Sequence, residues 1–84
     1  MLFNIKAIEK QADKLISEKS GIAGFSGVYN WHWHNGIIAG AYVSAIVETT
    51  QGLFCVQFWK RRNLVQLHKE SQPGIFTPIA SQSI

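Results

Sequence analysis

Histidine and cysteine are the residue types of this chain best suited to bind a metal ion or to attack a substrate, and it has three histidines and one cysteine. His32 and His34 stand two residues apart, so on a β-strand their rings would point the same way and could converge on one ion. A metal site needs more ligands, and no carboxylate lies near them in the sequence. We therefore interpret them as partly exposed histidines on a hairpin, and we predict neither a metal nor another cofactor.

A nucleophile beside a base is the other chemistry that these residues could perform. Cys55 and His68 become cross-strand neighbours if residues 60–63 form a turn, but no third group is placed to orient the histidine, and cysteines within strands are mostly inert. Three of the five carboxylates fall on a helix face that we assign to water, which makes an acid–base pair hard to assemble. We predict that the protein is not an enzyme.

Aromatic residues are concentrated in segments that alternate like β-strands, and we take them as the candidate partner-binding site. The five candidates are Tyr29, Trp31, Trp33, Tyr42 and Trp59. The strand register derived below places all five on one face of a sheet, together with Ile38 and Ile46. The solvent-facing side of an antiparallel sheet normally carries polar residues, so this face predicts a covering partner.

Self-association is the function that this face favours, because two-fold dimers are the commonest oligomers and a domain of 84 residues has only a small core of its own. A different protein partner comes next, since interface centres are rich in aromatic residues. The C-terminal segment could instead fold back over the face, and a ring beside a glycine also stabilises ordinary sheets. We predict a small non-enzymatic interaction protein that forms a homodimer or occupies the surface of another protein.

Basic residues near the aromatic side chains support an alternative function, a nucleic-acid-binding module. The residues concerned are Lys60, Arg61, Arg62 and Lys69. In such modules cations meet phosphates and rings stack on unpaired bases. No zinc-finger, helix-turn-helix or RNA-recognition motif accompanies these residues, so nucleic acid remains the second choice of partner.

A helix over residues 4–20 is the first element expected to support these surfaces. Asn4 is a suitable N-cap, apolar residues recur at three- and four-residue spacing, and Gly21 ends the pattern. The charged residues between the apolar ones, including Glu9 and Asp13, are expected to face water. Because the sequence pattern predicts one helix and one sheet, we expect the helix to pack on the sheet.

A β-hairpin over residues 37–59 is the centre of the expected sheet. A loop at residues 49–52, with Gly52 in the left-handed conformation, sorts the strand residues into an apolar face and a mixed, aromatic face. The pairs on the apolar face are Val47 with Phe54, Ala45 with Val56, and Val43 with Phe58. The pairs on the mixed face are Ile46 with Cys55, Ser44 with Gln57, and Tyr42 with Trp59.

A first strand over residues 28–34 is expected to precede this hairpin. Asn35-Gly36 is a strong signal for a two-residue turn, and that turn places Tyr29 opposite Tyr42. The same register pairs His34 with Ile37, Trp33 with Ile38, Trp31 with Gly40, and Val28 with Val43. The aromatic residues of the first strand would then share the mixed face with those of the hairpin.

A fourth strand over residues 64–68 follows the turn at 60–63 and places Val65 and Leu67 on the apolar face. The sheet then spans residues 28–69, and residues 71–84 form an extended tail that lies along a sheet edge or is partly mobile. The predicted fold class is α+β. An N-terminal helix packs on one face of a four-stranded antiparallel β-meander, in a single domain of residues 1–84.

Composition bounds the remaining possibilities. The chain is 46% hydrophobic and 15% charged, which is typical of a folded protein. A single cysteine allows no internal disulfide and suits a reducing compartment, so we expect a cytoplasmic protein. The start lacks a signal-peptide pattern and the longest apolar run, residues 36–47, is too short to span a bilayer as a helix, so we expect no membrane association. A net charge of +3 permits an acidic partner without requiring one.

Overall fold

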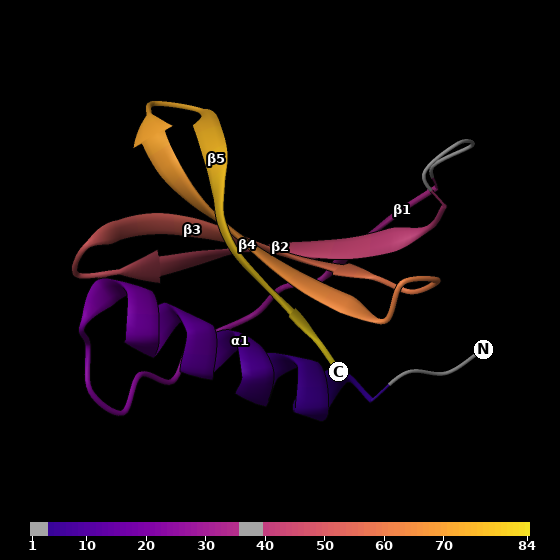
Figure 1. The fold of residues 1–84 in the computed structure, drawn as a ribbon. Coiled ribbons are helices and arrows are strands. Elements are labelled where there is room, and N and C mark those ends of the chain that lie inside the picture. Colours follow the sequence, from indigo (N-terminus) through magenta and orange to yellow (C-terminus); the bar gives the residue numbers. More distant parts are fainter. Residues whose placement is uncertain (1–3, 36–39) are drawn as a thin grey trace.

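The computed structural model describes residues 4–35 and 40–84 and contains one helix packed on a five-stranded antiparallel sheet (Figure 1). The elements are α1 (Ile5–Ser20), β1 (His32–His34), β2 (Tyr42–Thr49), β3 (Gly52–Trp59), β4 (Leu64–Gln72) and β5 (Ile75–Ser83). Each strand pairs with the next one along the chain, so the sheet is a meander. The predicted α+β class is confirmed, with five strands in place of four.

Helix α1 begins and ends where the sequence predicts. The Asn4 side chain accepts a hydrogen bond from the Ala7 N–H at 3.1 Å, which satisfies a backbone donor of the first turn. Gly21 has φ 73° and its N–H donates to the Ser17 carbonyl, which is the usual way in which a left-handed glycine closes a helix.

The core lies between α1 and the apolar face of the sheet, which we call the inner face. Its helix residues are Ile8, Ala12, Leu15 and Ile16. Its sheet residues are Val43, Ala45, Val47, Phe54, Val56, Phe58, Val65 and Leu67. Every other residue along the central strands is buried, so one side of each strand faces the helix and the other side does not. We call the second side the open face.

The register of β2, β3 and β4 is the one that the sequence predicts. The pairs include Glu48 with Leu53, Tyr42 with Trp59, Trp59 with Leu64, and Val65 with Phe58. Gly52 has φ 107° at the β2–β3 turn, and Asn63 has φ 51° at the β3–β4 turn. Positive φ values are tolerated best by glycine and next by asparagine, so both turns suit their residues.

The register of β1 differs from the prediction. Tyr42 pairs with His34 and not with Tyr29, so the first strand is displaced from residue 29 to residue 34. Because side chains alternate with a period of two, this odd displacement exchanges the faces of the first strand. Val28, which precedes β1, is 79% exposed and does not join Val43 in the core. The predicted pairings with residues 37 and 38 lie outside the described residues.

Residues 25–31, which we call the strap, run along α1 because two helix carboxylates bind them. The Tyr29 hydroxyl donates to Asp13 Oδ1 at 2.6 Å, and Trp31 Nε1 donates to Glu9 Oε2 at 2.9 Å. Both acidic residues were expected to face water, and that expectation is wrong. These bonds replace the predicted strand pairing and leave β1 only three residues long.

The C-terminal residues form β5, which pairs with β4 along the edge of the sheet. The register shifts between Leu67 and His68, next to the position of Pro78, and proline is tolerated in an edge strand because its nitrogen needs no partner there. The Ile84 N–H donates to the Asn63 carbonyl at 2.9 Å. The tail therefore widens the sheet and does not lie over the open face.

Candidate functional site

Three aromatic rings from neighbouring strands stand side by side at one end of the open face. Tyr42 stacks on His34 with a centroid distance of 4.5 Å and on Trp59 with a centroid distance of 4.2 Å. The planes differ by 13° and 22°. Arg62 extends the series, with its guanidinium carbon 5.7 Å from the Trp59 ring centroid. We call His34, Tyr42 and Trp59 the aromatic row.

The rings of the aromatic row stand upright on the sheet. Adjacent strands lie about 4.8 Å apart, so rings from neighbouring strands can stack at these distances only if they project outward with their faces toward each other. Two hydrogen bonds fix the ends of the row, one between His34 Nε2 and Ser44 Oγ at 2.7 Å and one from Trp59 Nε1 to Gln57 Oε1 at 3.1 Å. The row therefore presents fixed ring edges to its surroundings.

The rest of the open face has mixed polarity. Its outward residues on β2, β3 and β4 include Ser44, Ile46, Glu48, Leu53, Cys55, Gln57, Leu64, Gln66 and His68. Ile46 is 50% exposed. In Figure 1 the helix lies on the other side of the sheet and the β4–β5 turn rises on this side. Among the described residues, no element covers the open face.

The structure separates Tyr29 and Trp31 from the other predicted partner-binding residues. Both rings pack against the core on the helix side, 5.4 Å apart and nearly parallel. Burial raises the pKa of Tyr29 well above its usual range, and the hydrogen bond to Asp13 and the charges of Asp13 and Glu9 raise this pKa further. The placement of these two rings on the open face was wrong, because the strap is bound to the helix.

Trp33 is also apart from the aromatic row. It pairs with Val43, whose side chain points to the inner face, so Trp33 lies on the helix side of the sheet. Trp33 is 51% exposed, and its Nε1 donates to Asn35 Oδ1 at 2.8 Å. Of the five predicted residues, only Tyr42 and Trp59 are brought together on the open face, and His34 takes the position expected for Tyr29.

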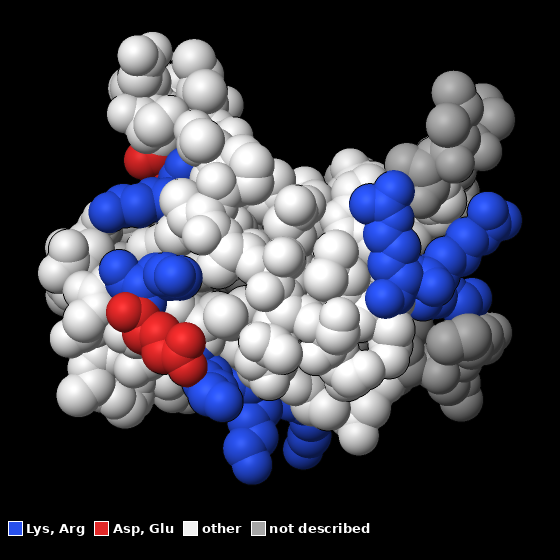
Figure 2. Space-filling model, viewed as in Figure 1, with Lys and Arg blue, Asp and Glu red and all other residues white. Residues whose placement is uncertain are grey.

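The basic residues divide into two groups. Lys60, Arg61 and Arg62 lie in the turn between β3 and β4, at the same end of the sheet as the aromatic row, and Figure 2 shows Lys and Arg side chains gathered at this end. Lys69 pairs with Phe54, and its Nζ lies 5.7 Å from the Phe54 ring centroid. Lys69 therefore does not join the basic turn.

Cys55 and His68 are cross-strand partners on the open face, as the register predicts. Burial raises the pKa of the Cys55 thiol and lowers the pKa of the His68 imidazole, so both side chains favour their neutral forms. His68 Nε2 is hydrogen-bonded to Gln66 Oε1 at 3.2 Å. A neutral thiol is a poor nucleophile and a poor metal ligand. Within residues 4–35 and 40–84, no three His, Cys, Asp or Glu side chains cluster as metal ligands.

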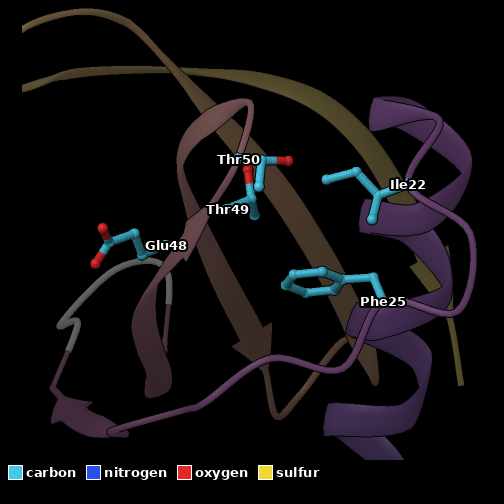
Figure 3. Close-up of a pocket in the computed structure, with 5 residues that line it drawn as sticks. All are labelled: Ile22, Phe25, Glu48, Thr49 and Thr50. Carbon is cyan, nitrogen blue, oxygen red and sulfur yellow. The ribbon is translucent and has the colours of Figure 1, made fainter.

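Two hollows lie along the margin of β2, between this strand and the segment that follows α1. The first has a volume of about 430 Å³ and is lined by Ile22, Phe25, Glu48, Thr49 and Thr50. Figure 3 shows that Ile22 and Phe25 face the two threonines across it, while Glu48 points away. The second has a volume of about 350 Å³ and is lined by Ser26, Gly27, Val28, Asn30, Ile46 and Glu48. The sequence did not predict either hollow, since both depend on the position of the strap.

No protein-family model, curated protein or solved structure matches this chain. The one helix in the described parts of the chain is not long and apolar enough to cross a membrane.

Proposed function

We propose that the protein is a small non-enzymatic interaction module that pairs with a second copy of itself through the open face. The observation that carries this proposal is the aromatic row on a sheet face over which no described element lies. An uncovered face with aromatic side chains and few charges is typical of interface centres. Partner burial would also enlarge the small core of an 84-residue domain.

The geometry of the aromatic row favours a protein surface over nucleic acid. A nucleobase stacks on the face of a ring, and both faces of Tyr42 are already occupied by His34 and Trp59. Arg62 lies over the Trp59 ring as well. The exposed ring edges and the neighbouring amide and hydroxyl groups suit the mixed apolar and polar contacts of a protein interface. Nucleic-acid binding through the turn of Lys60 to Arg62 is the alternative.

Charges at the two ends of the open face support a second copy as the partner. Arg62 lies at the end of the aromatic row, whereas Glu48 and Glu70 lie toward the other end of β2 and β4. A two-fold axis that crosses the strands would place the basic end of one copy against the acidic end of the other. A stable interface buries about 600–1,000 Å² of each partner. The chain exposes 5435 Å², so less than a fifth of its surface would be needed.

Gln57→Glu tests this proposal at the centre of the open face. The variant keeps an oxygen that can accept the hydrogen bond from Trp59 Nε1, but in a dimer it would bury two like charges near each other. We expect the wild type to sediment as a dimer at micromolar concentration and Gln57→Glu to weaken the dimer by at least about tenfold, equivalent to about 1.4 kcal/mol.

Gln51→Glu is the matched control, because it makes the same change in the exposed β2–β3 turn and should leave the dimer intact. A wild-type protein that is monomeric at every concentration tested, or equal behaviour of the two variants, would contradict the proposal. Fluorescence anisotropy with a labelled single-stranded oligonucleotide tests the alternative. Binding that weakens steeply with salt and is lost in Arg62→Gln would favour nucleic acid as the partner.

A further inference from the structure

We propose that the free half of β2 binds an extended strand of another protein. β1 pairs with β2 only at residues 42–44, whereas β2 continues to Thr49. In the described parts of the chain, no main-chain hydrogen bond joins the strap to β2. Residues 45–49 therefore form a sheet edge beside the two hollows. This surface is separate from the centre of the open face and shares only Glu48 with the acidic end of the proposed dimer interface.

Backbone groups at this edge define the class of ligand. Alternate residues of a strand direct their N–H and C=O groups to opposite sides, so part of residues 45–49 offers these groups away from β3. Such a row of unpaired groups is a template for another strand. At the opposite edge of the sheet, β5 carries Pro78 and a bulge, and both features hinder strand addition. The free half of β2 lacks both features.

The strap leaves room for a strand in the plane of the sheet. Its odd-numbered residues are half-buried and its even-numbered residues are exposed, so it is extended, with Val28 pointing outward. A Cβ atom at Gly27 would lie 2.9 Å from Val47 Cγ1 on the inner face. The strap thus passes beneath the margin of β2, toward the helix. The second hollow, of about 350 Å³, lies beside β2, where a bound strand would be placed.

The two hollows and the free half of β2 together form a cleft. The side chains along this cleft indicate which residues the bound strand should contain. Glu48 borders both hollows, and no ion pair involves it within residues 4–35 and 40–84. A lysine or arginine of the bound strand would complement this carboxylate. Ile22 and Phe25 line the first hollow and offer an apolar site for one large side chain of the strand.

These requirements point to a different protein as the source of the strand. A second copy offers two long free edges, β5 and its own residues 45–49, and neither contains a lysine or arginine to meet Glu48. β5 also contains Pro78, which removes a main-chain donor. The occupant that we infer is therefore a strand from another polypeptide, with alternating β-branched residues, one basic residue and one large apolar residue.

A synthetic probe peptide tests the site directly. The probe is a short fluorescein-labelled peptide that alternates valine and threonine and carries one lysine and one phenylalanine. We expect it to slow hydrogen exchange of alternate amides in residues 45–49 by at least about tenfold, because each newly paired amide is then protected. A version methylated on alternate backbone nitrogens should not bind, since it cannot form the main-chain hydrogen bonds.

Variants of the cleft complete the test. Val28→Arg would fill the second hollow and repel the lysine of the probe, so we expect at least about tenfold weaker binding. Ile75→Arg is the matched control, because it places the same charge at an exposed aliphatic residue of β5, away from the cleft. Glu48→Gln should weaken binding by about two- to fivefold, as expected for an exposed ion pair.

Three results would overturn the inference. They are slow exchange of all amides of residues 45–49 in the free protein, equal binding of the methylated probe, and equal affinities of Val28→Arg and Ile75→Arg. Val28 does not belong to the open face, so sedimentation of Val28→Arg should match that of the wild type. Failure of the strand site and failure of the proposed dimer are therefore distinguishable.

Discussion

Tyr29→Phe tests the bond that fixes the strap to the helix. The substitution removes only the hydroxyl that donates to Asp13 Oδ1 at 2.6 Å. A hydrogen bond to a charged group contributes about 1.5–3 kcal/mol to stability. Asp13 is half-buried and keeps the hydrogen bond from the Gly27 N–H, so water and this donor offset part of the loss. We expect the free energy of unfolding at pH 7 to fall by about 1–2 kcal/mol.

The pH dependence of this difference has a defined sign. The pKa of Tyr29 is raised in the folded protein, so the folded state holds the phenolic proton more tightly than the unfolded chain does. This contribution to stability is complete below the tyrosine pKa of the unfolded chain, about 10, and is lost as the pH rises above it. The loss has an upper bound of about 1.4 kcal/mol per pH unit. Because phenylalanine does not ionise, the wild type should become the less stable protein near a pH of about 11.

Urea unfolding followed by tryptophan fluorescence, at several pH values from neutral to strongly alkaline, measures both effects. Tyr42→Phe is the control, because it removes the other tyrosine and leaves the bond to Asp13 intact. A stability difference between wild type and Tyr29→Phe that stays constant across the alkaline range would refute the reasoning. It would mean that the folded protein does not protect the Tyr29 proton.

Three further predictions concern the helix cap, the core and the open face. Asn4→Ala should lower the free energy of unfolding by about 0.5–2 kcal/mol through loss of the bond to the Ala7 N–H, measured by urea unfolding, whereas Asn4→Ser should retain most of it. Leu67→Ala removes a side chain with no exposed surface and should cost about 2–5 kcal/mol in the same assay, with an unchanged slope against urea concentration. Burial lowers the pKa of His68, so the unfolded chain binds its proton more tightly and stability falls as the pH drops below about 6.5. The urea midpoint of His68→Gln should be less sensitive to acid than that of the wild type, and equal sensitivity would count against this assignment.

Local patterns predicted the central part of the fold. Asn4 and Gly21 bound α1 because capping is decided by the residues next to the helix. The register of β2 and β3 follows from alternation, since a one-residue slip would move Val43 and Phe58 out of the core. The same argument placed Trp59 and Tyr42 correctly on the open face. In each case the deciding residues are close in sequence or repeat with a regular period.

The misplaced elements depend on contacts that no local pattern records. Tyr29 lies sixteen residues from Asp13 in the sequence, so no local pattern predicts the hydrogen bond between them. The residues of β5 include Pro78, which is unfavourable in a central strand but is tolerated at an edge. The sequence therefore predicts an extended tail where the structure has an edge strand. Nothing in the sequence indicates that Glu9 and Asp13, on the polar side of an amphipathic helix, accept hydrogen bonds from the half-buried side chains of Tyr29 and Trp31.

One cause underlies both the shortness of β1 and the cleft beside β2. Glu9 and Asp13 draw the strap toward α1, and a segment bound to the helix cannot also pair with β2. The sheet therefore loses a neighbour for residues 45–49 and gains the second hollow in its place. The hydrogen bonds of Tyr29 to Asp13 and of Trp31 to Glu9 each contribute about 1.5–3 kcal/mol. They take the place of main-chain hydrogen bonds between the strap and β2. A bound strand would restore that ladder without displacing the strap, because the strap lies beneath the edge and not in the plane of the sheet.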